Sequence, residues 1–474
     1  MGWIYALFLV SAIPVAIHIV FQKRSPYKTA AWILVLLLLP FLGVLFYLIF
    51  GQEYRKRKMF SVRGLEGLKE LRRISARQLR NIEQECTHED VRTHDNIIRL
   101  LLNNSNALLS TGNELEILKD GHDTFKAIFN AIEKAQHHIH LEYYIFANDS
   151  IGQKIISQLI KKRAEGVEVR IIVDDVGSWN LKSNFFENLR KQGIEIFPFM
   201  EVRFPRLTSR VNYRNHRKII VIDGKTGFIG GVNITDRYLN GSKKLGPWRD
   251  THLQIHGDAA TSLQILFLAD WYFVSQKNLL HKTYLPKFTE ADGIPVQIAA
   301  GGPDYDWEGI AQAFFAAIND ARKRVFLVTP YLMPPQPLLF ALKTAALSHI
   351  DVRIIIPEKS DSKISKWGSF SYVEELLEAG VKVYFYTRGF THSKYMLVDD
   401  TFSTIGTTNF DFRSFETNFE ANAFIYSRNF NAKLETLFLE DQKNSRQIKL
   451  SQWRKRGWLF KLRESLAHII SPMM

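Results

Sequence analysis

Cysteine is almost absent from this sequence: Cys86 is the single thiol among 474 residues. One thiol excludes an intramolecular disulfide and any zinc or iron–sulfur site built from several thiolates. Acidic residues are outnumbered, with 48 Asp and Glu against 62 Lys and Arg, and the net charge of +14 favours anionic partners such as nucleic acid or acidic lipid. A hydrophobic share of 46% excludes a disordered chain, and the length allows several domains.

Charge is missing altogether from two stretches of the first fifty residues. Residues 3–21 and 30–50 contain no Asp, Glu, Lys or Arg. Each stretch is about long enough to cross a hydrocarbon core of roughly 30 Å as a helix. We therefore predict that residues 1–51 form two transmembrane or membrane-embedded helices. A shallow re-entrant first helix is an alternative, whereas a cleaved signal peptide fits less well because a second apolar stretch follows at once.

Basic residues flank the second stretch on both sides, so they compete in setting its orientation. The loop before it carries Lys23, Arg24 and Lys28, and residues 55–58 after it are all basic. The second flank is the more basic one, which favours a cytoplasmic location for the remainder of the chain. Residues 52–112 contain many opposite charges three and four positions apart, and we predict a charged helical connector lying over the membrane.

The remainder of the chain is duplicated. Four blocks recur in the same order, and the clearest pair is HRKIIVIDGKTGFIGGVN from His216 and HSKYMLVDDTFSTIGTTN from His392. Strand-like and helix-like stretches alternate in both copies. We therefore predict an α/β fold of two pseudo-symmetric α/β/α sandwich halves, residues 113–290 and 291–474, each with a mostly parallel sheet. The first copy has extra residues over 203–214, which we interpret as an Arg-rich loop at the rim of a site.

Both copies share His-x-Lys-x4-Asp, followed by Gly and Asn at the same spacing. The residues are His216, Lys218, Asp223, Gly230 and Asn233 in the first copy and His392, Lys394, Asp399, Gly406 and Asn409 in the second. On a strand, side chains two positions apart face the same side, so each histidine and its lysine point together. The aspartate then falls in the turn between two strands. Each copy thus offers an imidazole, an ammonium and an amide to one ligand.

These groups suit a phosphodiester. An imidazole can act as nucleophile or proton carrier near neutral pH, and ammonium and amide groups can stabilise charge on phosphoryl oxygens. We predict that the two sets meet in one site, where one histidine attacks phosphorus and the other protonates the leaving oxygen. Because one imidazole must be neutral and the other protonated, the pH profile should be bell-shaped. Asp223 and Asp399 complete the candidate catalytic set, although a role limited to the turns explains them better.

The paired motifs resemble those of the phospholipase D superfamily. The apolar N-terminal stretches and GPWRDTHLQIHG at residues 246–257 are similar to the cardiolipin synthases of bacteria within it. The resemblance implies phospholipase D-like halves that transfer a phosphatidyl group from one phosphatidylglycerol to another. The products would be cardiolipin and glycerol, and the intermediate a phosphatidyl-histidine. It implies no cofactor and no metal, no nucleic acid as partner, and a multi-pass location at the anionic surface of the bacterial plasma membrane.

The resemblance also assigns roles. It makes His216 the nucleophile and His392 the acid and then the base, and it implies that Asp250 and Glu420 orient the histidines. Asn233 and Asn409 are the candidate phosphate-binding amides. Which histidine attacks does not follow from a near-symmetric duplication itself.

Other interpretations stay open at this point. A hydrolytic phospholipase D or another phosphatidyltransferase, such as one that uses serine, shares the chemistry. A nuclease fits the charge, but the apolar stretches favour a bilayer substrate. The cluster of His137, His138 and His140 lacks further ligands at zinc spacing. The basic amphipathic stretch at residues 453–470 fits either a membrane surface or packing on the second half.

Overall fold

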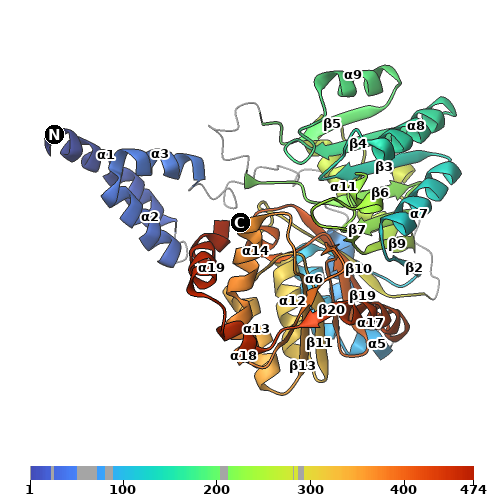
Figure 1. Cartoon of the computed structure of the whole chain (residues 1–474). Helices are drawn as coiled ribbons and strands as arrows, with labels where there is room; N and C mark the ends of the chain where they lie inside the picture. Colours follow the sequence, from blue (N-terminus) through green and yellow to red (C-terminus); the bar gives the residue numbers. More distant parts are fainter. Residues whose placement is uncertain are drawn as a thin grey trace.

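The computed structural model describes residues 2–22, 26–50, 72–80, 89–202, 212–280, 282–286 and 293–473. Two α/β halves lie against each other, and three apolar helices stand beside them (Figure 1).

The first half is built around a seven-stranded sheet with the strand order β2-β9-β7-β6-β3-β4-β5. Its strands are β2 (Asn113–Leu118), β3 (His138–Tyr143), β4 (Glu168–Asp174), β5 (Glu195–Phe199), β6 (Lys218–Ile222), β7 (Thr226–Gly230) and β9 (His252–Gly257). Strands β3, β4 and β5 pair in parallel, whereas every other pairing in this sheet is antiparallel.

The second half repeats this arrangement in a nine-stranded sheet with the order β1-β10-β19-β17-β16-β11-β13-β14-β20. Its strands are β1 (Leu109–Ser110), β10 (Val296–Gly301), β11 (Arg324–Val328), β13 (Asp351–Pro357), β14 (Lys382–Tyr386), β16 (Tyr395–Val398), β17 (Phe402–Gly406), β19 (Glu420–Tyr426) and β20 (Ser445–Gln447). The predicted duplication into two halves is confirmed. The prediction of mostly parallel sheets is wrong, because the motif strands form hairpins, whose short turns join antiparallel neighbours.

Helices cover both sheets. Helices α7 (Gly121–Lys134) and α8 (Ser150–Ala164) share a buried cluster with one face of the first sheet, and α12 (Gly309–Asp320) and α13 (Gln336–Leu347) do so with one face of the second. A further cluster contains residues of both sheets, of α11 (Asp258–Ser275) and of α17 (Arg428–Lys443). Ile219 and Leu253 of the first half meet Phe326, Ile355 and Leu397 of the second there. The two halves therefore share one apolar core.

Further helices complete the two halves. They are α5 (Glu89–Arg92), α6 (Asp95–Ser105), α9 (Ser183–Lys191), α10 (Arg237–Asn240), α14 (Lys363–Ser371), α15 (Val373–Glu378), α16 (Phe412–Glu416), α18 (Leu450–Arg454) and α19 (Trp458–Ile470).

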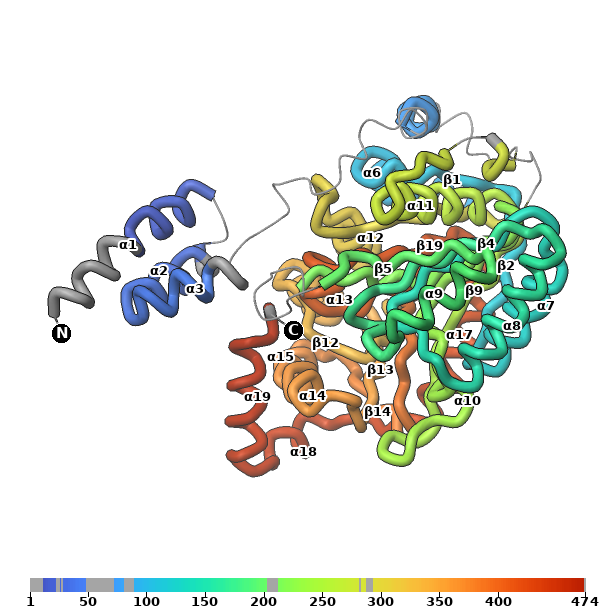
Figure 2. The backbone as a smooth tube through the Cα atoms, turned by 90° about the horizontal axis from the view of Figure 1, so that it is seen from above, coloured from blue at the N-terminus to red at the C-terminus, as the bar shows by residue number. Residues whose placement is uncertain are grey.

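The apolar N-terminal residues form three helices, not the two that we predicted. They are α1 (Gly2–Phe21), α2 (Pro26–Leu38) and α3 (Pro40–Phe50), which pack on one another (Figure 2). The expected second span, residues 30–50, divides before Pro40, because proline lacks an N–H group and favours the first position of a new helix. Gly43 then allows a close approach: a Cβ there would lie 2.9 Å from the carbonyl oxygen of Val35. Among the described residues, no helix has the length and apolar character needed to span a bilayer.

We predicted a separate connector over residues 52–112. From residue 89 on, the described part of this segment belongs to the second half. Helix α6 packs on α12, and β1 joins the second sheet beside β10. Ile97, Ile98 and Leu101 of α6 are fully buried in the core of the second half. These apolar side chains lie on one side of the helix, and its charged residues lie on the other. The charged residues are the reason that the sequence predicts an exposed segment here. The basic residues 55–58 lie outside the described residues.

The motif aspartates close the turns that follow β6 and β16. Asp223 and Asp399 have positive φ angles of 54° and 49°, a conformation that aspartate tolerates better than most residues. The carboxylate of Asp223 accepts hydrogen bonds of 2.8–2.9 Å from the backbone N–H groups of residues 136–138. Asp399 accepts three bonds of 2.7–3.0 Å from residues 322–324. Each aspartate thus fastens its hairpin to the start of the neighbouring strand, β3 or β11.

We expect the substitution Asp223→Ala to lower the free energy of unfolding by about 1–2 kcal/mol, because three backbone donors lose a charged acceptor at once. Asp223→Asn should cost less, since the amide oxygen keeps two of the three bonds and asparagine also tolerates a positive φ. Urea unfolding followed by circular dichroism measures both. Equal stability of the alanine variant and the natural chain would contradict the structural role of this aspartate.

Candidate active site between the two halves

The two motif histidines line one cavity of about 300 Å³ where the halves meet. Each histidine is 7% exposed. The first half contributes Tyr144, Ile145, Arg214, His216, Asn233, Arg237, Tyr238 and Trp248, and the second contributes Tyr331, Met333, Asp361, Ser365, His392, Asn409, Asp411, Arg413 and Asn418. The cavity therefore brings together both imidazoles and both asparagines of the predicted set.

Backbone hydrogen bonds between the halves hold the two histidines. The N–H group of His216 donates to the carbonyl oxygen of Phe419 at 2.9 Å, and that of His392 donates to the carbonyl oxygen of Arg249 at 2.7 Å. Strands β8 (Trp248–Arg249) and β15 (Phe390–Thr391) pair in parallel just before the second contact. Phe419 and Arg249 directly precede Glu420 and Asp250 in the chain, so each histidine lies next to an acid of the opposite half.

The side chain of each histidine also contacts the acid of the opposite half. The Nδ1 atom of His216 lies 2.9 and 3.0 Å from the two carboxylate oxygens of Glu420. The Nδ1 atom of His392 lies 2.8 Å from Oδ2 of Asp250. Both acids are fully buried. Because an ionised carboxylate only accepts, each Nδ1 carries the proton and donates, and each neutral imidazole keeps an unprotonated Nε2.

The two acids differ in their electrostatics. Burial raises the pKa of Glu420, but the charge and hydrogen bond of His216 and the charge of Lys218 outweigh burial, and the pKa lies below its ordinary value. The hydroxyl of Thr407 also donates to Oε2 of Glu420. Burial raises the pKa of Asp250 to about 6, against the opposing effect of Lys394. Near neutral pH, Glu420 is therefore the more firmly ionised of the two.

Burial also shifts the basic groups towards neutrality. It lowers the pKa of His216 to about 4, and it lowers the pKa of His392 well below the usual value, where Lys394 and Lys218 act in the same direction. Burial lowers the pKa of Lys218 to about 7 and that of Lys394 to about 8. Each ammonium donates to the carbonyl oxygen of its own histidine, at 2.6 and 2.5 Å. Two imidazoles in the cavity wall, each with an ammonium group bonded to its own residue, thus favour an anion in the cavity.

The two asparagines differ in their contacts. Oδ1 of Asn233 accepts a hydrogen bond from the N–H of Ile145, and its Nδ2 donates to the hydroxyl of Tyr238 at 3.0 Å. That hydroxyl lies 3.2 Å from Nδ1 of His392. Within the described residues, Oδ1 of Asn409 is buried without a hydrogen-bond partner. Asn233 thus supports the tyrosine beside His392, whereas Asn409 lines the cavity without such a contact through its buried Oδ1.

Asp223 and Asp399, which we placed in the candidate catalytic set, do not line this cavity. They lie at the far ends of β6 and β16, because the four residues between lysine and aspartate carry the chain along the strand. Their contacts there are to backbone N–H groups, as described above. The histidine of each motif lines the cavity, the lysine donates to the carbonyl oxygen of that histidine, and the aspartate anchors the hairpin that carries both.

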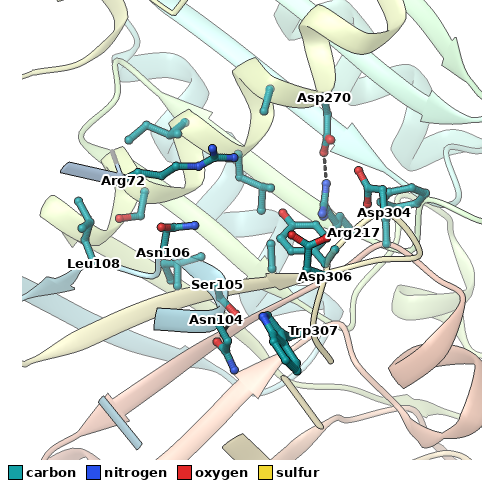
Figure 3. Close-up of a pocket in the computed structure, with 18 of the residues that line it drawn as sticks. Arg72, Asn104, Ser105, Asn106, Leu108, Arg217, Asp270, Asp304, Asp306 and Trp307 are labelled. Carbon is teal, nitrogen blue, oxygen red and sulfur yellow. Dashed lines mark hydrogen bonds and ion pairs between the residues drawn. The ribbon is translucent and has the colours of Figure 1, made fainter. Parts of the chain in front are cut away.

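Arg217, between His216 and Lys218, faces away from the site. Its guanidinium pairs with Asp270 in a separate cavity of about 440 Å³ (Figure 3). Its Nε donates to the carbonyl oxygen of Glu420 at 3.3 Å. Arg217 is 1% exposed, and its charge is balanced on this side of the sheet. The alternation expected of a strand is therefore present, with His216 and Lys218 on one side and Arg217 on the other.

The histidine cluster has a different environment. His138 and His140 are buried, and both rings contact the side-chain oxygen of Gln264, at 3.1 and 3.2 Å. Burial lowers the pKa of both histidines. They act as polar members of the core between β3 and α11.

Comparison with known proteins identifies the family. The model described as the cardiolipin synthase, PLD-like domain matches residues 128–247 and 314–442, and the model described as the phospholipase D-nuclease N-terminal domain matches residues 3–52. A cardiolipin synthase of Geobacillus sp. (strain WCH70) is 43% identical over 100% of this chain and 94% of its own length. One of Listeria monocytogenes serotype 4b is 40% identical over 99% of this chain and 98% of its own length. The chain belongs to the bacterial cardiolipin synthases of the phospholipase D superfamily.

Membership of the cardiolipin synthases makes the chain an enzyme of phospholipid biosynthesis, a phosphatidyltransferase. Among solved structures, the phosphatidylserine synthase of Haemophilus influenzae Rd KW20 has a similar fold. The TM-score is 0.62 at 15% identity, and the match covers 80% of this chain and 100% of that one. The two-half α/β architecture is therefore shared with a solved protein.

Several cavity residues of this cardiolipin synthase escaped the sequence analysis. Tyr238, Asp361 and Asp411 gave no signal, because they reach the cavity from loops and short helices outside the repeated blocks. Thr407 was detectable in principle, since it follows Gly406 directly within the second motif. Of the predicted Arg-rich rim loop, Arg214 lines the cavity, and residues 203–211 lie outside the described residues.

Proposed function

We propose that this cardiolipin synthase joins two molecules of phosphatidylglycerol, releases glycerol and passes through a phosphatidyl-histidine. The observation that carries the proposal is the single cavity lined by two imidazoles, each bonded through Nδ1 to a buried carboxylate of the opposite half. A phosphodiester held there has a ring nitrogen available for attack and a second one for proton transfer.

In the first step, Nε2 of His216 attacks the phosphorus of the donor lipid. The new N–P bond forms as the P–O bond to the glycerol head group breaks, and His392 gives its Nε2 proton to that glycerol oxygen. Positive charge develops on the His216 ring, and the ionised carboxylate of Glu420 at Nδ1 stabilises it. The firmer ionisation of Glu420 than of Asp250 supports His216, and not His392, as the nucleophile.

In the second step, His392 acts as the base, and an incoming hydroxyl group takes the place of the glycerol that left. Glycerol departs, and His392 is left neutral. A glycerol hydroxyl of the second phosphatidylglycerol gives its proton to His392, and its oxygen attacks the phosphorus. The N–P bond to His216 breaks, and cardiolipin forms. The transfer is reversible, because one phosphodiester is exchanged for another.

The basic groups around the cavity bind the phosphate. Lys218 and Lys394 supply positive charge beside both histidines, and the amide of Asn409 adds a donor at the cavity wall. The negative charge of the bound phosphodiester raises the pKa of His392, against the effects of burial and the lysines. His392 therefore takes up its proton when the substrate binds and is neutral before that.

The membrane provides the substrate in this proposal. Exposed apolar side chains lie on all three N-terminal helices, among them Ile17, Val20, Leu37, Phe41 and Phe46. We place the enzyme at the plasma membrane, held by α1–α3 and attracted to its anionic surface by a net charge of +14. The more basic flank after the apolar residues supports a cytoplasmic position for the two halves.

Product analysis tests the function. With vesicles of phosphatidylglycerol, the natural enzyme should yield cardiolipin and glycerol in equal amounts. His216→Ala and His392→Ala should each lower kcat by at least about a thousandfold, because each removes a group that acts in both steps. Chromatography of the lipids and an enzymatic assay of glycerol measure both products. His256→Ala, which alters an exposed histidine on β9, should retain full activity.

The outcomes separate the candidate functions. Phosphatidic acid in place of cardiolipin would identify a hydrolase, and a requirement for another alcohol would identify a different phosphatidyltransferase. Either histidine variant with most of its activity intact would contradict the shared site.

The pH dependence follows from the shifted groups. His216 must be neutral to attack and Asp250 must be ionised to hold His392, and their pKa values of about 4 and about 6 predict that kcat/KM falls as the pH drops below about 6. Lys218 and Lys394 must be charged to bind phosphate, and their pKa values of about 7 and 8 predict a fall as the pH rises through that range. Steady-state rates between pH 4 and 9 measure the curve. A rate that already falls below half as the pH is lowered to 7 would contradict both values.

A further inference from the structure

Helix α19 has a broad apolar face that no other described part of the chain covers. Its six large apolar side chains on this face are 41–74% exposed. They are Trp458, Leu459, Leu462, Leu466, Ile469 and Ile470. At 3.6 residues per turn they fall within an arc of about 120°. We call these six residues the α19 apolar face.

The opposite side of α19 belongs to the folded body. Glu464 and Ala467 are buried, and α19 packs along α14. Nδ1 of His468 lies 3.1 Å from the hydroxyl oxygen of Ser371 at the end of α14. The helix therefore keeps its position without the apolar face, whose side chains contribute no core packing. The structure thus combines the two alternatives that the sequence left open, packing on the second half and an outward apolar surface.

Helix α14 links this region to the catalytic cavity. Asp361 and Ser365, at the beginning of α14, line the cavity, while Ser371 at its end contacts α19. Ile364, between the two lining residues, is 48% exposed. Both views of the molecule show α19 beside α14, on the side of the body that faces α1–α3 (Figures 1 and 2). An exposed apolar side chain, Ile364, thus lies between two cavity residues on the helix that packs against α19.

Basic residues border the α19 apolar face. Lys461 and Arg463 fall on its two edges on the helical wheel, and the guanidinium of Arg463 lies 5.6 Å from the ring centre of Trp367 on α14. Trp458 is at the beginning of the helix and is 71% exposed. An apolar stripe edged by Lys and Arg, with an exposed tryptophan, is the pattern of a helix that lies in the interface of an anionic bilayer.

We propose that the α19 apolar face rests in the leaflet that supplies the substrate, and that α14 and α19 together hold the mouth of the catalytic cavity at the lipid surface. The inference rests on the proposed function, since that function requires lipid to enter the cavity. The occupant is a leaflet rich in anionic phospholipid. The basic edges of the stripe and its place on the side of the body that faces α1–α3, whose apolar side chains are exposed, favour a bilayer over a second copy of the chain.

Activity on two forms of the same lipid tests this role. Leu466→Asp and Leu462→Asp place a charge on the apolar face without altering the core. Each should lower kcat/KM on phosphatidylglycerol vesicles by about tenfold and leave the rate on short-chain phosphatidylglycerol, dispersed as monomers, unchanged. Leu439→Asp makes the same exchange on α17, where Leu439 is 37% exposed, and should leave both rates unchanged.

The remaining outcomes overturn the inference. If both α19 variants keep the rate of the natural enzyme on vesicles, the α19 apolar face does not contact the bilayer. An equal loss on both lipid forms would show that the substitutions act on the cavity.

A fluorescent label tests the contact independently of turnover. Leu466→Cys in a Cys86→Ser background carries an environment-sensitive dye, and Leu439→Cys provides the matched control. Phosphatidylglycerol vesicles with brominated acyl chains should quench the dye at position 466 and not at 439. A dye at 466 that the lipid does not quench would overturn the inference, because the face would then be covered by α1–α3 or by another copy of the chain. This readout stands even if the enzyme makes no cardiolipin, so it separates the two proposals.

Discussion

The hydrogen bond between each motif histidine and the buried acid of the opposite half is the contact on which the site depends. Neither half contains a complete pair: His216 needs Glu420, and His392 needs Asp250. Separation of the halves would leave two carboxylates without their partners and would expose the apolar core that both sheets share. The duplication therefore does more than supply two copies of one motif, because the exchange of acids makes the two halves a single catalytic unit.

The same contact explains the electrostatics of the cavity. Burial removes water from two imidazoles and two ammonium groups, and it lowers the pKa of all four. The two acids compensate only from behind the histidines, at Nδ1. The cavity itself is lined by two further acids, Asp361 and Asp411, and by three arginines, Arg214, Arg237 and Arg413. A lipid phosphate completes this arrangement and supplies the charge that allows His392 to carry a proton.

The sequence predicted the features that are local and repeated. The His-x-Lys pairs, the hairpins and the two halves follow from spacing and from duplication. The sequence did not predict features that depend on tertiary packing. The pairing of each histidine with the acid of the opposite half depends on how the two halves meet. The direction of the strands in the sheets depends on where the returning strands are inserted. Helix α6 falls within the predicted connector because residues 52–112 as a whole are highly charged, although Ile97, Ile98 and Leu101 of this helix are buried. Pro40 lies inside the second apolar stretch, which we predicted as one helix, whereas in the structure it begins a new helix.

The position of the covalent intermediate tests the central claim most directly. The natural enzyme would be mixed with phosphatidylglycerol, quenched within a turnover by alkali, which preserves the N–P bond, and digested for mass spectrometry. A phosphatidyl group on the peptide that contains His216, absent from the His216→Ala variant, is the result that the firmer ionisation of Glu420 beside His216 predicts. The same group on the peptide that contains His392, or equally on both, would contradict it.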